Sequence, residues 1–132
     1  MSDIKCARML LGAAERDLLA LRSMSAAAPE EAFGFHVQQA AEKALKAWLA
    51  VLGEAYPLTH NLTTLLTLLS ALGAATTRYE TLADYTPYAV EFHYTGVDPD
   101  AEAIDRSGAA ALVQGLLSDV DRALENAAGE SR

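Results

Sequence analysis

The stretch FGFHVQQAAEKALKAWLAVLG, residues 33–53, decides the fold of this 132-residue chain. Its apolar residues recur at the three- and four-residue steps of an α-helix, and they fall on two stripes. The first stripe comprises Phe33, Val37, Ala44, Trp48 and Val51, and the second comprises Phe35, Leu45, Leu49 and Leu52. A helix with two apolar stripes contacts neighbours on two sides. The stretch therefore predicts the central helix of a bundle, and its second stripe is a candidate contact with a second subunit.

The ends of the central helix carry their own signals. Pro29 predicts its start, because proline is favoured in the first turn. Glu30 and Glu31 follow at the positive helix end, where carboxylates are stabilising. Gly53 predicts its C-terminal end, since glycine adopts the left-handed conformation that closes many helices. Gly34, near the start, weakens the first turns slightly.

Two further helices are predicted on either side of the central one. The first spans residues 3–24, with Ser2 as its N-cap. The other begins at a second capping residue, Thr59, and ends at Gly73. Its apolar face is formed by Leu62, Leu65, Leu66, Leu69 and Leu72.

The remaining part of the chain predicts a short broken helix and a last long one. A helical segment begins at Thr77, and Pro87 kinks or breaks it because proline lacks a backbone donor. The last helix follows the cap Asp98 and the first-turn residue Pro99. Its apolar face is formed by Ala110, Val113, Leu117, Val120 and Leu124.

These elements predict an all-α fold, an up-and-down helical bundle of four long helices plus a short broken helix. The chain contains no alternating strand pattern, internal repeat or linker. We therefore expect a single domain over residues 1–132, frayed at residues 1–2 and 128–132.

Composition limits the classes of partner. The formal net charge is −8, with 18 acidic and 10 basic residues. This balance argues against autonomous binding of long nucleic acid, which needs clustered Lys and Arg, and favours a basic protein partner. Cys6 is the single cysteine, and we find neither a signal peptide nor an apolar run of membrane-spanning length, so we expect a cytoplasmic protein outside the membrane. The three histidines lack metal-ligand spacing, and no metal or cofactor is expected.

Polar residues of the central stretch form two candidate sites. His36, Gln39, Lys43 and Lys46 share one helical face, which is either a solvated surface or a strip that contacts a phosphate or another small anion. The second candidate is the pair Gln38 and Glu42, which lies within the second apolar stripe.

Burial of Gln38 and Glu42 would require hydrogen-bond partners. Glu42 and Lys46 are spaced for an ordinary surface ion pair. The alternative is that Glu42 and Gln38 form a buried polar network at a subunit or partner interface.

Other candidate residues lie outside the central stretch. His60 either forms hydrogen bonds near a helix start or contacts a ligand or partner. Tyr79, Tyr85, Tyr88, Phe92 and Tyr94 are crowded in one region. Within it, His93 and Tyr94 either pack in the core or contact a nucleotide or a partner, and Tyr88 belongs to the same potential stacking surface.

Three segments together resemble the HEPN domain (higher eukaryotes and prokaryotes nucleotide-binding). Residues 35–47, FHVQQAAEKALKA, are similar to its central-helix signature. Residues 59–62, Thr-His-Asn-Leu, resemble its Thr-His-Asp-Leu motif, with Asn61 in place of aspartate. Residues 88–94, YAVEFHY, resemble a segment that usually ends in Arg-Tyr-Pro, with His93 and Thr95 at the arginine and proline positions. Helix order and lengths agree as well, so the resemblance covers essentially the whole domain.

The resemblance implies a helical bundle that often dimerises and is often paired with a minimal nucleotidyltransferase encoded nearby. Many HEPN proteins are metal-independent ribonucleases that use an arginine followed, after four to six residues, by a histidine. The arginine stabilises phosphate charge and the histidine moves a proton. The corresponding windows before His36, His60 and His93 read PEE, GEA and TPY, without arginine.

We therefore expect a non-catalytic HEPN-like domain, a homodimer that acts as the partner or substrate-binding subunit of a nucleotidyltransferase in a toxin–antitoxin or stress-response pair. Two alternatives stay open. One is a ribonuclease toxin with a variant site that includes His93 and Tyr94. The other is a small nucleotide-binding module that uses the polar row and the tyrosines.

Overall fold

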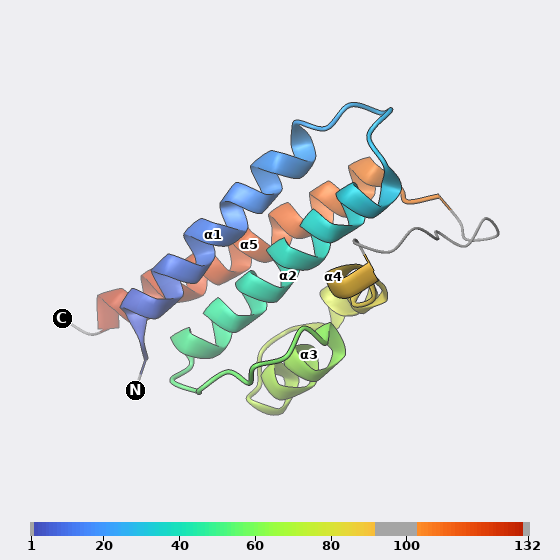
Figure 1. Cartoon of the computed structure of the whole chain (residues 1–132). Helices are drawn as coiled ribbons and strands as arrows, with labels where there is room; N and C mark the ends of the chain where they lie inside the picture. The colour runs from blue at the N-terminus through green and yellow to red at the C-terminus, as the bar shows by residue number, and fades with distance from the viewer. Residues whose placement is uncertain (1, 92–102, 131–132) are drawn as a thin grey trace.

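The computed structural model describes residues 2–91 and 103–130, and every regular element within them is helical. This confirms the predicted all-α bundle (Figure 1). The elements are α1 (Ile4–Arg22), α2 (Glu30–Val51), α3 (Leu62–Ala71), the 3-10 helix η1 (Thr77–Tyr85), α4 (Tyr88–Glu91) and α5 (Arg106–Glu130). The predicted broken helix corresponds to η1 and α4, which are separated near Pro87. The helix α3 has only 10 residues, compared with 22 in α2.

The three long helices have the relative directions expected of the first, second and fourth helices in an up-and-down bundle. The helix α1 is antiparallel to α2, and α5 runs parallel to α2 (Figure 1). The Ile104 backbone N–H, just before α5, donates to the Glu30 carboxylate at the start of α2 at 2.8 Å. Near the other end of α5, Glu125 pairs with Arg8 of α1 at 3.7 Å. The short elements between α2 and α5 return the chain to the N-terminal end of α2, which allows the parallel arrangement.

The helix α2 is the centre of the core. It contacts α1 and α5, and also α3, η1 and α4, as the two apolar stripes predicted. All five residues of the first stripe are buried. In the second stripe, Leu45 and Leu49 are also buried by the chain itself, whereas Phe35 is half-buried and Leu52 is 41% exposed. Leu45 and Leu49 are therefore covered within the chain, and contact of this stripe with a second subunit stays a prediction for Phe35 and Leu52.

The predicted cap of the first helix lies one residue from the real one. Asp3, rather than Ser2, caps α1 by accepting from the Cys6 backbone N–H at 3.1 Å. The Ser2 hydroxyl donates instead to the carbonyl of Val51, where α2 ends. Adjacent residues with oxygen-bearing side chains satisfy the same sequence rule, and only the path of the chain decides which one reaches the helix N–H groups.

The last helix begins later than predicted. Asp98 and Pro99 lie outside the described residues, and residues 103–105 are not helical. The carboxylate of Asp105 accepts from the Gly108 N–H at 3.0 Å, as an N-cap does. The helix then continues to Glu130. Four of its five predicted core residues are buried, and Ala110 is partly buried.

The predicted glycine ends are confirmed, and Gly34 has a packing role. Gly53 and Gly73 have φ of 80° and 90°, in the left-handed region. A Cβ at Gly34 would overlap the ring of Tyr88. The missing side chain at Gly34 therefore lets α4 approach α2 closely. The packing gained in this way outweighs the small cost of glycine in helix stability.

Candidate functional site

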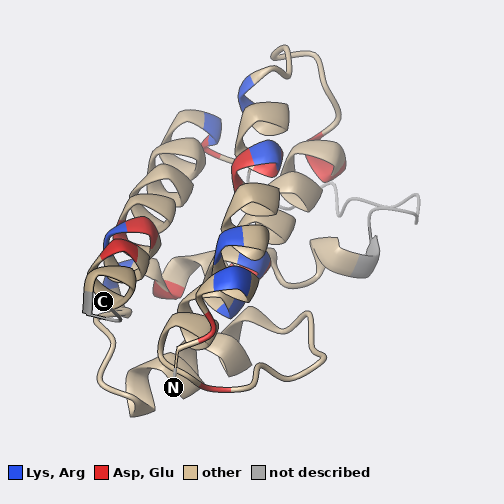
Figure 2. Ribbon diagram, turned by 90° about the vertical axis from the view of Figure 1, so that its left-hand side faces the viewer, with Lys and Arg blue, Asp and Glu red and all other residues tan. Residues whose placement is uncertain are grey.

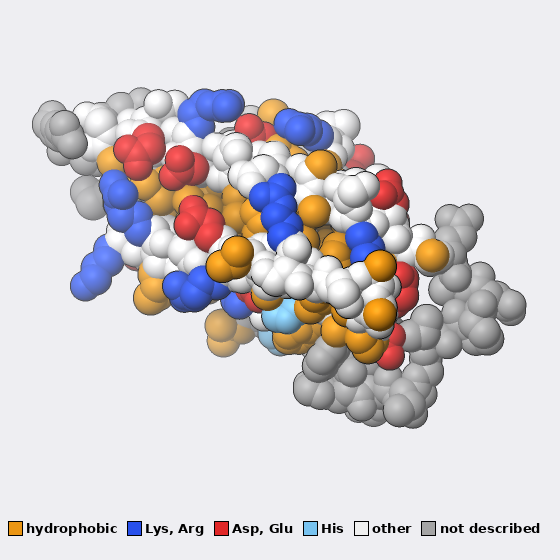
Figure 3. Space-filling model, turned by 90° about the horizontal axis from the view of Figure 1, so that it is seen from above, with side chains coloured by type: hydrophobic (Ala, Val, Ile, Leu, Met, Phe, Trp, Pro, Cys, Tyr) orange, Lys and Arg blue, Asp and Glu red, His pale blue; other side chains and the backbone are white. Residues whose placement is uncertain are grey.

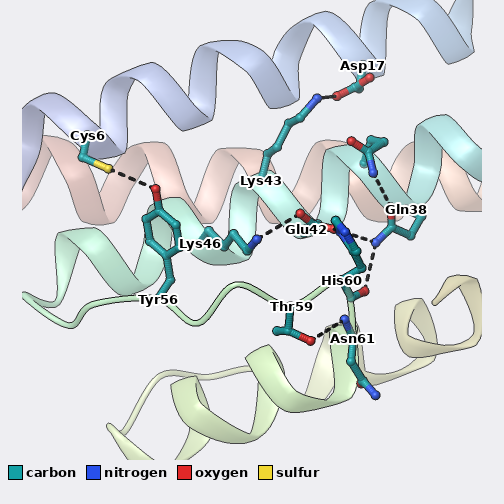
Figure 4. Close-up of polar contacts among 11 residues, drawn as sticks. Cys6, Asp17, Gln38, Glu42, Lys43, Lys46, Tyr56, Thr59, His60 and Asn61 are labelled. Atoms are coloured by element: carbon teal, nitrogen blue, oxygen red, sulfur yellow. Dashed lines mark hydrogen bonds and ion pairs between the residues drawn. The ribbon is translucent and has the colours of Figure 1, made fainter. Parts of the chain in front are cut away.

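Glu42 of α2 is the centre of a buried polar cluster (Figure 4). Its Oε1 accepts hydrogen bonds from Gln38 Nε2 at 3.0 Å and from His60 Nδ1 at 2.8 Å. Its Oε2 accepts from Lys46 Nζ at 3.0 Å. The side chains of Glu42 and Lys46 are only 9% and 10% exposed. The Glu42–Lys46 ion pair is therefore present, but it is buried rather than on the surface, and it forms part of the predicted buried network with Gln38. A role of this network at a subunit or partner interface stays a prediction.

The helical repeat explains how three of these residues meet. Gln38, Glu42 and Lys46 follow one another at four-residue steps, so they lie on one face of α2. His60 comes from the segment that joins α2 to α3. The backbone carbonyl of His60 accepts a hydrogen bond from Gln38 Nε2 at 3.0 Å. His60 is therefore attached to α2 through both its ring and its backbone.

The electrostatics of the cluster keep Glu42 ionised. Burial raises the pKa of this carboxyl group, but the hydrogen bonds from Gln38, His60 and Lys46, together with the Lys46 charge, outweigh it and lower the pKa below its ordinary value of 4.5. A buried carboxylate is tolerable only with such partners. Both oxygens of the ionised Glu42 carboxylate therefore accept hydrogen bonds from within the chain.

His60 differs from the other members of the cluster because its side chain is 65% exposed. An ionised carboxylate accepts hydrogen bonds, so we place a proton on the His60 Nδ1 that faces Glu42. The other ring nitrogen, Nε2, forms no hydrogen bond within the described part of the chain. The prediction that His60 forms hydrogen bonds near a helix start agrees with these contacts, but the hydrogen-bond partners are Glu42 and Gln38 of α2.

The neighbours of His60 also take different roles from those predicted. Asn61, not Thr59, caps α3: its side-chain oxygen accepts from the Thr64 N–H at 3.2 Å. The Thr59 hydroxyl oxygen accepts from the Asn61 N–H at 3.1 Å. Asparagine is as effective an N-cap as aspartate, so the departure from the Thr-His-Asp-Leu pattern preserves this function.

A second acid–histidine–lysine cluster connects α2 to α1. Asp17 of α1 lies 3.0 Å from His36 Nδ1 and 2.6 Å from Lys43 Nζ. Its side chain is 11% exposed. Asp17 was not among the predicted site residues. Its position in the helical repeat indicates burial, because Asp17 follows Ala14 by three residues and precedes Leu21 by four on the buried side of α1.

The polar row of α2 is consequently divided between the two clusters. His36 and Lys43 belong with Asp17, and Lys46 belongs with Glu42. Gln39 Nε2 donates to the Gln38 side-chain oxygen at 2.7 Å, which attaches it to the Glu42 cluster. Both lysines of the row are therefore already paired with carboxylates. Figure 3 shows histidine side chains on one face of the molecule, close to hydrophobic ones.

The tyrosines do not form one cluster. Tyr79 is fully buried, and its hydroxyl donates to Asp119 of α5; burial and this carboxylate raise its pKa to about 12. Tyr85 and Tyr88 form a ring pair with centroids 5.8 Å apart. Phe92, His93 and Tyr94 lie outside the described residues, so a role for His93 and Tyr94 stays a prediction.

A pocket of about 680 Å³ lies beside the Tyr85–Tyr88 pair. The elements η1, α4 and α5 contribute to its lining, which includes Arg78, Asp84, Tyr85, Tyr88, Ile104 and Asp105. This volume is within the range of small-ligand sites. Among the predicted site residues that the structure describes, only Tyr88 borders this pocket.

The remaining observations concern metal ligands, the single cysteine and membrane-spanning helices. In residues 2–91 and 103–130, no three His, Cys, Asp or Glu side chains are grouped as metal binding would require. The Cys6 thiol lies 3.8 Å from the Tyr56 hydroxyl, near the Lys46 end of the Glu42 cluster (Figure 4). Among the helices of those same residues, none combines the length and the apolar character of a bilayer crossing.

Comparison with known proteins agrees with the sequence motifs. The family profile described as HEPN domain matches residues 7–127, which is nearly the whole chain. No curated protein and no solved structure matches the chain significantly. The matched range includes both polar clusters and extends from α1 into the last turns of α5. The chain therefore belongs to the HEPN domain family.

Proposed function

We propose that this chain is a non-catalytic HEPN domain that dimerises and serves as the partner or substrate-binding subunit of a minimal nucleotidyltransferase, in a toxin–antitoxin or stress-response pair. One observation carries the proposal: the polar groups of the α2 motif are already paired within the chain, either with one another or with Asp17 and His60. Lys43 and Lys46 pair with Asp17 and Glu42 at 2.6 and 3.0 Å. They are therefore already engaged, whereas a ribonuclease needs cations directed at the scissile phosphate.

The distribution of arginine supports the same conclusion. The HEPN ribonuclease pair requires an arginine at a fixed interval before a histidine, and none of the three histidines has one. An arginine that lies against the start of α2 has a structural task. Arg106 of α5 donates to the Ser25 carbonyl at 3.0 Å, and its guanidinium lies 5.1 Å from the Phe33 ring centroid. It connects the α1–α2 link to α5.

The charge pattern supports a protein partner rather than RNA. Basic and acidic residues are interspersed along the long helices (Figure 2). With a net charge of −8, such a surface repels a polyanion overall. The exposed His60 ring is the part of the Glu42 cluster that a partner or a nucleotide reaches first. Leu58, two residues earlier, is 98% exposed and gives the same segment an apolar contact.

The proposal is tested by expressing the chain with the product of the neighbouring gene. We expect co-purification as a complex of defined mass in size-exclusion chromatography with light scattering. The isolated chain should run as a dimer and leave RNA intact in a metal-free cleavage assay. A monomeric chain with no complex would contradict the partner role, and metal-free RNA cleavage abolished by His93→Ala would show a ribonuclease instead.

A further inference from the structure

We propose that the pocket between η1, α4 and α5 binds the guanidinium group of an arginine side chain presented by a protein partner. This inference rests on the proposed function, because it names the partner's contact group. The argument depends on the two carboxylates and the two rings that line the pocket, Asp84, Asp105, Tyr85 and Tyr88.

The carboxylates supply uncompensated negative charge. Asp84 is exposed and makes no hydrogen bond or ion pair within the described residues. Asp105 uses its Oδ1 to accept from Ser107 and Gly108, at 3.3 and 3.0 Å, which leaves Oδ2 available for a ligand. Neither has a cation within ion-pair distance in the described part of the chain. Charge complementarity therefore favours a cationic group.

The rings supply a surface for a flat cation. Tyr85 and Tyr88 have centroids 5.8 Å apart and an interplanar angle of 36°, so they form an open corner rather than a closed stack. Tyr88 is held in place because its ring occupies the space above Gly34. A guanidinium is planar, stacks on aromatic faces and donates two parallel hydrogen bonds to a carboxylate. The ammonium group of a lysine would complement the charge of the two aspartates, but it is not planar and cannot stack on the rings in the same way.

Arg78 lines the same pocket but does not neutralise it. Its guanidinium lies 5.6 Å from the Tyr79 ring centroid, and Nη2 is 2.8 Å from where a Cβ on Gly115 would be. It is therefore directed along α5, away from an ion pair with either aspartate. The potential at Tyr85 agrees: burial raises the pKa of this hydroxyl to about 12, with contributions from Tyr88 and from the charges of Glu30, Asp105 and Asp84.

The first experiment uses a minimal probe. The full chain, labelled with ¹⁵N, is titrated at low ionic strength with the peptide acetyl-Gly-Arg-Gly-amide and with its citrulline counterpart, which has the same shape without the charge. We expect saturable amide shifts at Asp84, Tyr85 and Gly108 with the arginine peptide, and at least about fivefold weaker binding of the citrulline peptide. Equal binding of both peptides, or shifts spread over the surface, would overturn the proposal.

The second experiment uses matched variants. Asp84→Asn removes one carboxylate charge from the pocket, and Asp121→Asn removes the same charge from an exposed position further along α5. Tyr85→Leu removes one ring. We expect Asp84→Asn and Tyr85→Leu each to weaken arginine-peptide binding about threefold or more, and Asp121→Asn to leave it unchanged. Equal weakening by both Asn variants would show only general attraction to an acidic protein.

The two proposals fail separately. If the nucleotidyltransferase complex forms and Asp84→Asn does not weaken it or the binding of the arginine peptide, the pocket assignment is wrong and the partner role stands. If the arginine peptide binds as expected and no complex forms, the pocket binds guanidinium and the proposed partner role is wrong.

Discussion

His60 Nδ1 lies 2.8 Å from Glu42 Oε1 across 18 positions of sequence, and the carbonyl of the same His60 accepts from Gln38 Nε2 at 3.0 Å. A residue at the entrance to α3 is thereby attached to α2 through both its backbone and its ring. The two most distinctive motifs of the chain, the central-helix signature and Thr-His-Asn-Leu, are therefore in direct contact. Four predictions test how this and neighbouring contacts stabilise the fold.

Glu42→Gln should destabilise the chain by about 3 kcal/mol, because it leaves the Lys46 ammonium buried without its counter-charge. Urea unfolding followed by circular dichroism measures the change. Glu125→Gln is the control, since Glu125 forms an exposed pair with Arg8 and its loss should not be measurable. An effect of Glu42→Gln no larger than that of the control would show that the cluster contributes little.

The pH dependence of stability should include a contribution from Glu42. Because its folded pKa is below the ordinary value of 4.5, this contribution is present above pH 4.5 and is lost as the pH falls through the folded pKa. Wild type should thus lose more stability than Glu42→Gln on going from pH 5 to pH 3. Urea midpoints measured across that range give the comparison, and parallel curves for the two proteins would contradict the expected shift.

Gly34→Ala and Gly12→Ala should have opposite effects. A Cβ at Gly34 overlaps the Tyr88 ring, so alanine there must displace α4 and cost about 1–3 kcal/mol. At Gly12 of α1 a Cβ meets nothing within 4 Å, so alanine should stabilise the helix by about 0.5–1 kcal/mol. Thermal unfolding of both variants provides the test. A neutral Gly34→Ala would mean that Tyr88 moves aside freely.

Asn61→Ala should cost about 1 kcal/mol, because the Thr64 N–H loses its cap at the start of α3. Asn61→Asp, which restores the residue of the family motif, should retain wild-type stability within a few tenths of a kcal/mol. Thr59→Ala should cost less than Asn61→Ala, since Thr59 accepts from one loop N–H only. Urea unfolding ranks the three, and a larger loss for Thr59→Ala would reverse the assignment of the cap.

Periodicity predicted most of the fold because burial follows the helical repeat closely. The first stripe of α2, the buried centre of the second stripe at Leu45 and Leu49, and the helix ends at Gly53 and Gly73 were predicted correctly, whereas Leu52 is 41% exposed. Helix starts were less predictable. Two neighbouring residues with capping side chains fit the sequence rule for an N-cap equally well. Contacts with other elements, such as the hydrogen bond from Ser2 to the Val51 carbonyl, decide which of the two caps the helix.

The candidate site was predicted in part for a similar reason. Gln38, Glu42 and Lys46 are close in sequence, so their contact follows from the helix alone. The contribution of His60 to the same cluster depends on the path of the loop between α2 and α3. Asp17 was not predicted because its partners are on another helix, and the apolar pattern of a single sequence shows which face is buried but not which polar side chains of two helices meet.

The parallel course of α2 and α5 has an electrostatic consequence for the whole bundle. Helix dipoles of antiparallel neighbours cancel, whereas those of α2 and α5 add, and both positive ends lie at the same end of the molecule. Glu30 and Glu31 occupy the first turn of α2, and Asp105 precedes α5 at that end. Some of the negative charge that gives this chain its net −8 thus compensates for two aligned dipoles and stabilises the fold.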